Sequence, residues 1–323
     1  MDEHTTINST IRGKAYEYAS VIALKELVEL IRPVAVIENS SLTIARDRYL
    51  NDISEAERAE MLASAKAGIG AIIRMEPKII EDGSDTITVS LQPDSVAKLG
   101  DVRDVLIIRR SIKWEVGVSV KHNHEALKHS RLSTKLDFGK SWYGIPSSKA
   151  YFDEIEPIFA NLKELKSQGA LWRDLPSKEQ SVYVPILNAF IRELNREYQN
   201  SGDDVTIGLI KYLLGSNGND YYKLIHHGNH TTRVIPYNLY GTLNKSSSNA
   251  SPDATIPTIE LPTRIIELAL KDNSQTTAVL TMNNGWSISF RIHNASSKVE
   301  TSLKFDIQLS GQPSSLFFID VTW

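Results

Sequence analysis

The chain has 323 residues, of which 41% are hydrophobic and 23% charged, a composition typical of a globular protein with one large domain or two modest ones. It contains no cysteine, which excludes disulfide scaffolds, thiolate zinc sites and cysteine nucleophiles. No stretch approaches the run of about 18 apolar residues that spans a membrane, and the polar, acidic N-terminal residues do not resemble a secretory leader. We therefore expect a cytoplasmic protein with no membrane partner.

The net charge of −3 is distributed unevenly along the chain. Residues 101–140 contain nine Lys or Arg against five Asp or Glu, together with three of the eight histidines. This stretch therefore carries a charge of +4 inside an acidic protein. Because a local excess of positive charge is what binds phosphate groups, the stretch is a candidate for contact with a nucleic acid.

Two helices are expected in the first part of the chain. Apolar residues recur at helical spacing over residues 13–31, and Pro33 then ends the helix. Glu17 lies at the head of this apolar stripe, so its carboxylate either reaches water at the edge of the stripe or lies inside the protein. A second helix is expected over residues 54–66, because its first four residues form a capping box.

Three strands and a further helix are expected next. Residues 86–91 alternate between polar and apolar side chains, which predicts a half-exposed strand. Residues 104–109 are an acid followed by an apolar run, and residues 114–121 predict a second strand joined to it by a turn as a hairpin. We expect a short helix over residues 123–132.

The second half of the chain is expected to begin with helices and to end with strands. Amphipathic patterns predict helices over residues 151–165 and 182–198, and the polar, Ser-rich segment 243–257 predicts a mobile loop. The expected strands, with a hairpin turn at Asn283-Asn284-Gly285, are 277–282, 286–293, 303–309 and 316–321.

The expected hairpin gathers residues that suit phosphodiester hydrolysis. Side chains alternate along a strand, so Glu115, Ser119 and Lys121 share one face. Asp104 opens the neighbouring strand and can lie beside Lys121, whereas Asp101, the alternative acid, has the character of a turn residue. Carboxylates hold a divalent cation against a phosphate, and a lysine can hold the attacking water or pair with the phosphate.

This layout resembles that of the PD-(D/E)xK nucleases, in which an Asp opens one strand and an (Asp/Glu)-x-Lys tripeptide closes the next. The tripeptide here is Ser119-Val120-Lys121, so the second acid is missing and the expected metal site lacks one ligand. Some restriction enzymes of this superfamily carry Ser-x-Lys and take the acid from a helix, which makes Glu17 the natural candidate. Glu115 and Glu125 are the alternatives.

Several longer segments resemble the HaeIII family of type II restriction endonucleases. In the middle of the chain they are 101–108, Gly117-Val-Ser-Val-Lys-His-Asn-His124, 128–133 and 137–140; towards the ends they are Gly13-Lys-Ala-Tyr-Glu-Tyr-Ala19 and 286–297. The resemblance touches both ends and the middle and so covers most of the chain, and its central block is the specific part.

The resemblance implies a Mg²⁺-dependent phosphodiesterase, in which Mn²⁺ substitutes, acting on duplex DNA without a nucleotide cofactor. It implies an α/β fold with a restriction-endonuclease-like core, a mixed central sheet flanked by helices, and a β-rich C-terminal region. Residues 1–150 would form the catalytic core, and residues 151–323 would complete it and contribute to DNA recognition, either separately or as one continuous domain. The family's namesake cuts the palindrome GGCC in its middle to leave blunt ends, and a palindromic target favours a twofold homodimer.

The expected catalytic residues are Asp104, Lys121, Ser119 and Glu17. The expected metal ligands are Asp104, Glu17 and Glu115, while Ser119 occupies the vacated acid position without strong ligation.

Candidate DNA-contacting residues follow the lysine and recur in a histidine-rich patch. They are Asn123, His124, Lys128, His129, Ser130, Arg131, His230 and Arg233. Arg131 is expected to contact a phosphate or a guanine edge, unless its helix is an ordinary surface helix. The adjacent letters His-Asn-His at 122–124 do not indicate an HNH nuclease, which distributes them across a ββα-metal fold, and a zinc site there lacks an evident third ligand.

Two other functions fit the same residues. A repair or structure-specific nuclease would cut branched or nicked DNA without a sequence preference. A catalytically silent DNA-binding protein of the same fold would explain the missing acid at Ser119, and would bind DNA in a salt-dependent way without turnover.

Overall fold

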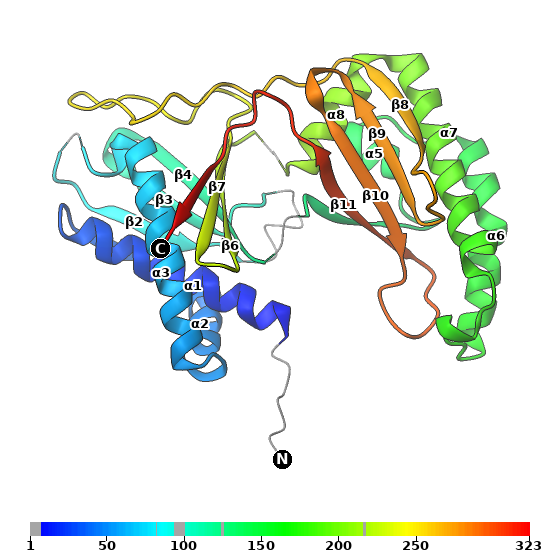
Figure 1. Cartoon of the computed structure of the whole chain (residues 1–323), viewed down its shortest axis with the longest axis horizontal. Helices are drawn as coiled ribbons and strands as arrows, with labels where there is room; N and C mark the ends of the chain where they lie inside the picture. Colours follow the sequence, from blue (N-terminus) through cyan, green and yellow to red (C-terminus); the bar gives the residue numbers. More distant parts are fainter. Residues whose placement is uncertain (1–7, 82, 94–100, 124–125, 216–217) are drawn as a thin grey trace. The chain divides into compact units, whose positions relative to one another are not determined.

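The computed structural model describes residues 8–81, 83–93, 101–123, 126–215 and 218–323. The chain forms two compact units, each built from separate stretches (Figure 1). The first unit comprises residues 1–125, 216–259 and 315–323, and the second comprises 126–215 and 260–314. The expected boundary at residue 150 therefore lies within the second unit. The sheet of the first unit is completed by strands from later in the chain.

The first unit contains a seven-stranded mixed sheet. The β1–β2 and β4–β6 pairs are parallel and the other pairs are antiparallel. In their order across the sheet the strands are β1 (Val34–Val36), β2 (Ile87–Leu91), β3 (Val105–Arg109), β4 (Trp114–His122), β6 (Tyr221–His227), β7 (Thr231–Tyr237) and β12 (Ile319–Thr322). The β3–β4 hairpin predicted from the sequence is confirmed.

Helices α1 (Ser9–Glu29), α2 (Ser40–Asp47) and α3 (Glu55–Met75) pack on one face of this sheet (Figure 1). Their buried side chains form one core with alternate residues of the central strands, among them Val116, Val118 and Val120. The side chain of Ser54 accepts a hydrogen bond from the backbone of Glu57, so Ser54 does cap the start of α3, whereas the Glu57 carboxylate accepts from Arg12. The intervening residues of β4, from Glu115 to Lys121, belong to the opposite face.

The second unit contains an antiparallel five-stranded sheet and four helices. In sheet order the strands are β5 (Lys128–Leu132), β11 (Leu303–Gly311), β10 (Ser287–His293), β9 (Thr277–Met282) and β8 (Ile265–Leu270). The helices are α5 (Phe138–Tyr143), α6 (Lys149–Ser167), α7 (Val184–Ser201) and α8 (Asp203–Leu213). The predicted α/β fold with a mixed sheet, flanking helices and a β-rich C-terminal region is confirmed.

The short helix expected over residues 123–132 is wrong. Residues 128–132 form β5, which pairs with β11 so that Leu132 faces Leu303 and Lys128 faces Ile307. The alternation of buried and exposed residues along β5 is that of a strand, and its partner lies about 170 residues later, beyond the reach of a local pattern.

The Ser-rich segment 243–257 contains no helix or strand, as expected. Asn244 anchors it: its side-chain amide donates to the carbonyls of Met75 and Ala254, and its backbone N–H donates to Glu76. The side chains of Leu243 and Ile256 are buried in the core. The predicted mobility of this segment stays a prediction.

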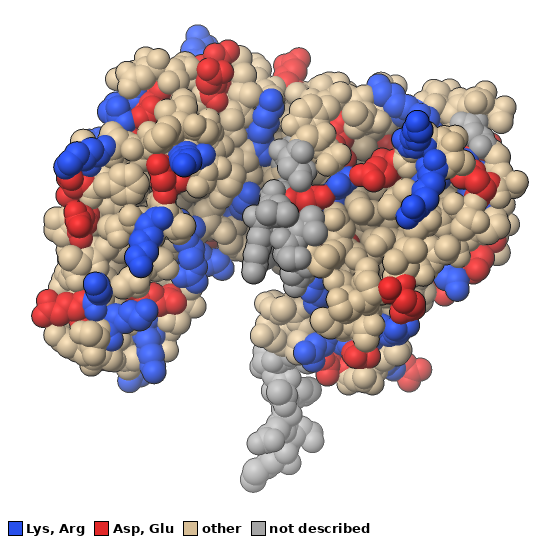
Figure 2. Space-filling view, turned by 180° about the vertical axis from the view of Figure 1, so that it is seen from behind, with Lys and Arg blue, Asp and Glu red and all other residues tan. Residues whose placement is uncertain are grey.

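On the face of the molecule seen in Figure 2, positive and negative side chains are mixed rather than segregated. In Figure 2 the Lys and Arg side chains of both units are interspersed with Asp and Glu side chains. Within the described part of the chain, no helix is long and apolar enough to cross a membrane.

Two glycines of α3 give a matched test of how closely this helix approaches the sheet. A Cβ atom added at Gly68 would lie 2.1 Å from Cδ1 of the buried Leu224 on β6, whereas one at Gly70 would meet only Arg74 Nη1 at 3.8 Å. We expect Gly68→Ala to lower the free energy of unfolding by about 1–3 kcal/mol through overpacking. Gly70→Ala should raise it by about 0.5–1 kcal/mol through helix propensity.

Chemical unfolding followed by circular dichroism measures both free energies of unfolding. A Gly68→Ala variant as stable as the Gly70→Ala variant would contradict the close packing of α3 on β6.

Candidate active site

The carboxylate of Asp104 is the centre of the candidate site. Asp104 precedes β3, and the antiparallel register of β3 and β4 brings it beside the last residues of β4. Its Oδ2 accepts hydrogen bonds from Lys121 Nζ at 2.9 Å, from the backbone N–H of Val120 at 2.7 Å and from Ser119 Oγ at 3.3 Å. The predicted proximity of Asp104, Ser119 and Lys121 is confirmed. The Oδ1 atom accepts no hydrogen bond from any described residue.

Glu17 approaches this cluster from α1. Its side chain is only 8% exposed, and Lys14 Nζ lies 3.0 Å from its Oε2. Burial, and then repulsion by the Asp104 carboxylate, raise the pKa of Glu17 from its ordinary 4.5 to about 8, although Lys14 and Lys121 act in the opposite direction. Of the two placements left open by the sequence, the buried one holds, and the first helix does bring an acid close to Asp104.

A second charged network holds the hairpin in shape. The guanidinium of Arg103 donates to Asp101 and, through Nη1 at 2.8 Å, to Glu115. To reach Glu115 it lies across Gly117, where an added Cβ would be 2.1 Å from Arg103 Cδ. Asp101 is therefore a structural partner of Arg103, as its turn-like position suggested.

The structure does not bring Glu115 into the cluster. Its side chain is 45% exposed and paired with Arg103, and it lies four residues from Ser119 along β4, or about 13 Å at the rise of a strand. Sharing a strand face with Ser119 therefore did not place Glu115 beside Asp104, and its role as a metal ligand stays a prediction.

A histidine pair lies on the helix-covered face beside the site. The rings of His122 and His226 stack with centroids 4.7 Å apart, and Tyr16 of α1 meets the His226 ring edge-on at 5.4 Å. Burial, and then the neighbouring histidines, lower the pKa of His226 to about 4. Its imidazole ring is therefore neutral at neutral pH. Its buried Nδ1 has no hydrogen-bond partner among the described atoms.

Three candidate DNA-contacting residues of the first unit are described: Asn123 follows β4, His230 precedes β7, and Arg233 lies within β7. The backbone N–H of Asn123 donates to the His226 carbonyl, with the residue in the left-handed conformation at φ 50°. The ring of His230 packs edge-on against Trp323, and Arg233 pairs with both carboxylate oxygens of Asp320 at 2.7 and 2.8 Å. The candidate His124, like the alternative acid Glu125, lies outside the described residues.

The other candidates lie on β5 in the second unit, and two of them are used internally. Lys128 Nζ lies 3.6 Å above the Tyr212 ring and donates to the Tyr212 carbonyl, and burial lowers the pKa of this lysine to about 8. Ser130 shares a hydrogen bond with the Tyr212 hydroxyl. His129 and Arg131 are more exposed; Arg131 donates to Ser302 Oγ at 2.7 Å.

Two residues near the site were missed from the sequence. Lys14 lies one helical turn before Glu17, a spacing from which its pairing with Glu17 could have been inferred. Lys223 on β6 is paired in register with Ser119, so it shares that strand face, and it is 5% exposed. No local pattern predicts that β6 lies parallel to β4, because about 100 residues separate them.

The carboxylates of the described residues do not by themselves supply a complete set of metal ligands. Among the described residues, no group of three His, Asp or Glu side chains gathers closely enough to hold a metal ion. The site instead presents two acids, Asp104 and Glu17, with a lysine beside each.

The mixed sheet, the acid–lysine hairpin and the acid supplied by the first helix define the first unit as a restriction-endonuclease-like core. The sequence profile of the HaeIII restriction endonuclease family matches residues 13–313. The chain is also 42% identical over 316 residues to the type II restriction enzyme HaeIII of Haemophilus aegyptius, covering 98% of each protein.

This chain belongs to the HaeIII restriction endonuclease family. The type II restriction endonuclease predicted from the sequence is thereby confirmed at the level of the family. No solved structure matches the fold significantly.

The raised pKa of Glu17 gives a prediction for stability against pH. Between pH 4.5 and about 8 the unfolded chain ionises this carboxyl while the folded protein keeps it protonated, so the contribution to stability falls as pH rises. Glu17→Gln removes this loss. The difference in free energy of unfolding, variant minus wild type, should therefore rise through that window and level off above it.

Urea unfolding between pH 5 and 9 without divalent cations measures the difference, with Glu29→Gln, an exposed acid of the same helix, as the matched control. A difference for Glu17→Gln that does not change with pH would show that the carboxyl is ionised normally.

Proposed function

We propose that this chain hydrolyses phosphodiester bonds of duplex DNA at a short palindromic site, with Asp104, Glu17 and Lys121 as its catalytic residues. The observation that carries the proposal is the contact between Asp104 and Lys121 beside a second, buried acid. It unites cation-binding oxygens with a positively charged donor, which is what cleavage of a phosphodiester by water requires.

Mg²⁺, for which Mn²⁺ would substitute, fits the oxygen donors of this site. Asp104 Oδ1 accepts no hydrogen bond from a described residue, and ionising Glu17 beside Asp104 places two like charges close together. A divalent cation would offset that repulsion and favour the ionised form of Glu17. When bound, the cation would lower the pKa of the attacking water and neutralise charge that develops on the phosphate.

The protein's own residues would orient the reaction. Lys121 would hold the attacking water or the scissile phosphate through its ammonium group, and Asp104 would fix the position of that ammonium group through their 2.9 Å contact. Ser119, buried to 2% exposure, would keep the carboxylate of Asp104 in place by donating to Oδ2 rather than bind the metal. Glu17 would supply the acid that the tripeptide lacks.

The target we propose is GGCC, cut in its middle to leave blunt ends. The support is the 42% identity to the enzyme HaeIII, which extends over 98% of both chains. Because a palindrome presents two identical half-sites, we propose that a twofold homodimer binds it. The DNA substrate makes the cytoplasm the compartment in which we expect the protein to act.

For DNA contact we retain Asn123, His124, His230 and Arg233 in the first unit and His129 and Arg131 in the second. Lys128 and Ser130 are assigned instead to holding Tyr212, because their side chains contact it and are more buried than those of His129 and Arg131 on the same strand.

Removing either partner of the central contact should abolish cleavage. Lys121→Ala and Asp104→Asn are each expected to lower the cleavage rate of plasmid DNA by about 100- to 1000-fold or more, since each removes a group that acts on the developing charge. Lys25→Ala and Asp52→Asn, at exposed positions of the same unit, should cut as wild type does.

Gel analysis of plasmid digests, with Mg²⁺ and with a chelator, measures the rates, and sequencing of the fragment ends identifies the target. Discrete fragments ending in GG and CC are expected, and none with the chelator. A Lys121→Ala variant within tenfold of wild type would contradict the assignment. A wild-type protein that binds DNA but never cuts it with any divalent metal would leave the silent DNA-binding function.

A further inference from the structure

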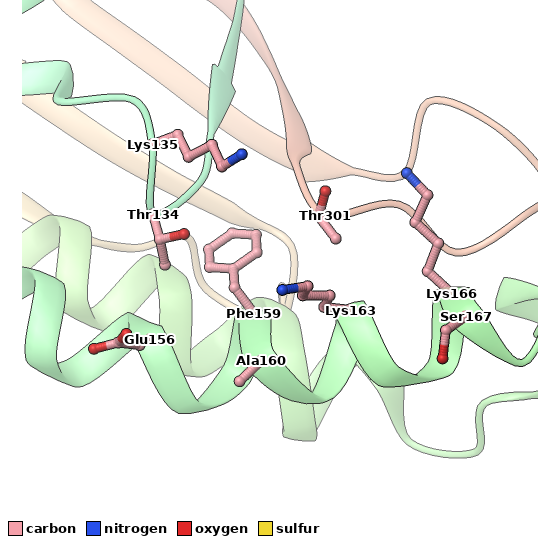
Figure 3. A pocket seen from close by; sticks show the side chains of 9 residues that line it. All are labelled: Thr134, Lys135, Glu156, Phe159, Ala160, Lys163, Lys166, Ser167 and Thr301. Carbon is pink, nitrogen blue, oxygen red and sulfur yellow. The ribbon is translucent and has the colours of Figure 1, made fainter.

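The second unit contains a pocket with several lysines, which the proposed catalysis does not use. It lies between α6 and the turns that follow β5 and precede β11, with a volume of about 670 Å³ (Figure 3). Lys135, Lys163 and Lys166 line it together with the hydroxyl-bearing residues Thr134, Ser167 and Thr301. We call it the lysine pocket.

The three lysines have no ion-pair partner among the described residues, unlike other charges of the same helix. Lys149 of α6 pairs with Asp153, and Glu154 pairs with Arg192 of α7. The pocket has one acid, Glu156, and in Figure 3 its carboxylate points away from the lysine nitrogens. The lysine pocket therefore carries an unbalanced positive charge within a chain of net charge −3.

The geometry of the pocket suits a phosphate group. Lys163 and Lys166 are three residues apart on α6, so their side chains leave neighbouring points of the same helix face. Lys135 reaches the pocket from the opposite wall, and Figure 3 shows its ammonium group directed into the space above α6. Lysine ammonium groups and hydroxyl groups are ordinary donors to phosphate oxygens, and neither imposes a base sequence.

A base-reading role fits the pocket poorly. Its aromatic side chain, Phe159, is only 4% exposed, so it offers no face on which a base could stack. The lining includes no Asn, Gln or Arg, the side chains that form two hydrogen bonds with a base edge.

We propose that the lysine pocket binds a phosphate of the DNA backbone and so adds affinity for duplex DNA that does not depend on sequence. This inference rests on the proposed function for the identity of the polyanion. Because each neutralised phosphate releases counterions, it makes a quantitative claim about salt: the slope of log affinity against log salt should decrease by about 0.9 for each phosphate contact that is lost.

The test compares Lys163→Ala/Lys166→Ala, alone and with Lys135→Ala, with wild type. Binding to two duplexes of equal length, one with GGCC and one without, is measured by fluorescence anisotropy across a salt series without divalent metal. We expect affinity for both duplexes to fall by the same factor, tenfold or more at low salt, with a smaller salt slope. Lys149→Ala, an exposed and paired lysine of the same helix, is the matched control and should bind as wild type.

Unchanged affinity and slope in the triple variant would overturn the proposal, as would a loss confined to the GGCC duplex. The proposal would also be overturned if the variants bind both duplexes normally while the wild-type pocket binds inorganic phosphate through its lysines. In that case the ligand of the pocket would be a free anion. The cleavage rate at saturating DNA should be unchanged. Because these readouts are binding constants, a wild type that binds but fails to cut DNA would contradict the proposed hydrolysis without deciding this test.

Discussion

The candidate active site depends on one arrangement: two carboxyl groups and a lysine at the place where β3, β4 and α1 meet. Asp104 is held by Lys121 and by the backbone of Val120, and Glu17 lies near enough for its pKa to rise to about 8. Bringing an acid into a buried place beside another acid opposes folding, and such costs are typical of sites that bind a cation or a phosphate. The rest of the unit supports this arrangement by positioning α1 against the hairpin.

Because Ser119 replaces the acid of the strand, the geometry of the site depends on helix packing rather than on strand register alone. Helix α1 is held in place by its buried apolar residues and by a chain of hydrogen bonds. The Tyr16 hydroxyl shares a hydrogen bond with Ser64 of α3, and Ser64 shares one with Thr232 of β7. Arg103 fixes the opposite face by crossing Gly117. A site of this kind is sensitive to changes in the core that never touch the reacting atoms.

The sequence was informative where structure is local and failed where partners are distant. Asp104 and Lys121 belong to one hairpin, so alternation and a short turn sufficed to pair them, and the capping-box pattern at Ser54 located α3. Glu17 was found through resemblance, and only packing decided that it is buried. The helix expected at 123–132 was wrong, because residues 128–132 pair as strand β5 with the distant β11. Glu115 was expected beside the other acids but pairs with Arg103 instead. Lys223 and His226 belong to β6, whose parallel pairing with β4 cannot be predicted from a local sequence pattern.

The central claim, that Asp104 and Glu17 form one cation site, is tested most directly by a double-mutant cycle on Mn²⁺ affinity, measured by isothermal titration calorimetry without DNA. The account predicts that Asp104→Asn and Glu17→Gln each remove most of the affinity and that the double variant loses little more, because the two acids act as one unit. It also predicts that Glu115→Gln binds as wild type does. A Glu17→Gln variant with wild-type Mn²⁺ affinity would contradict the claim.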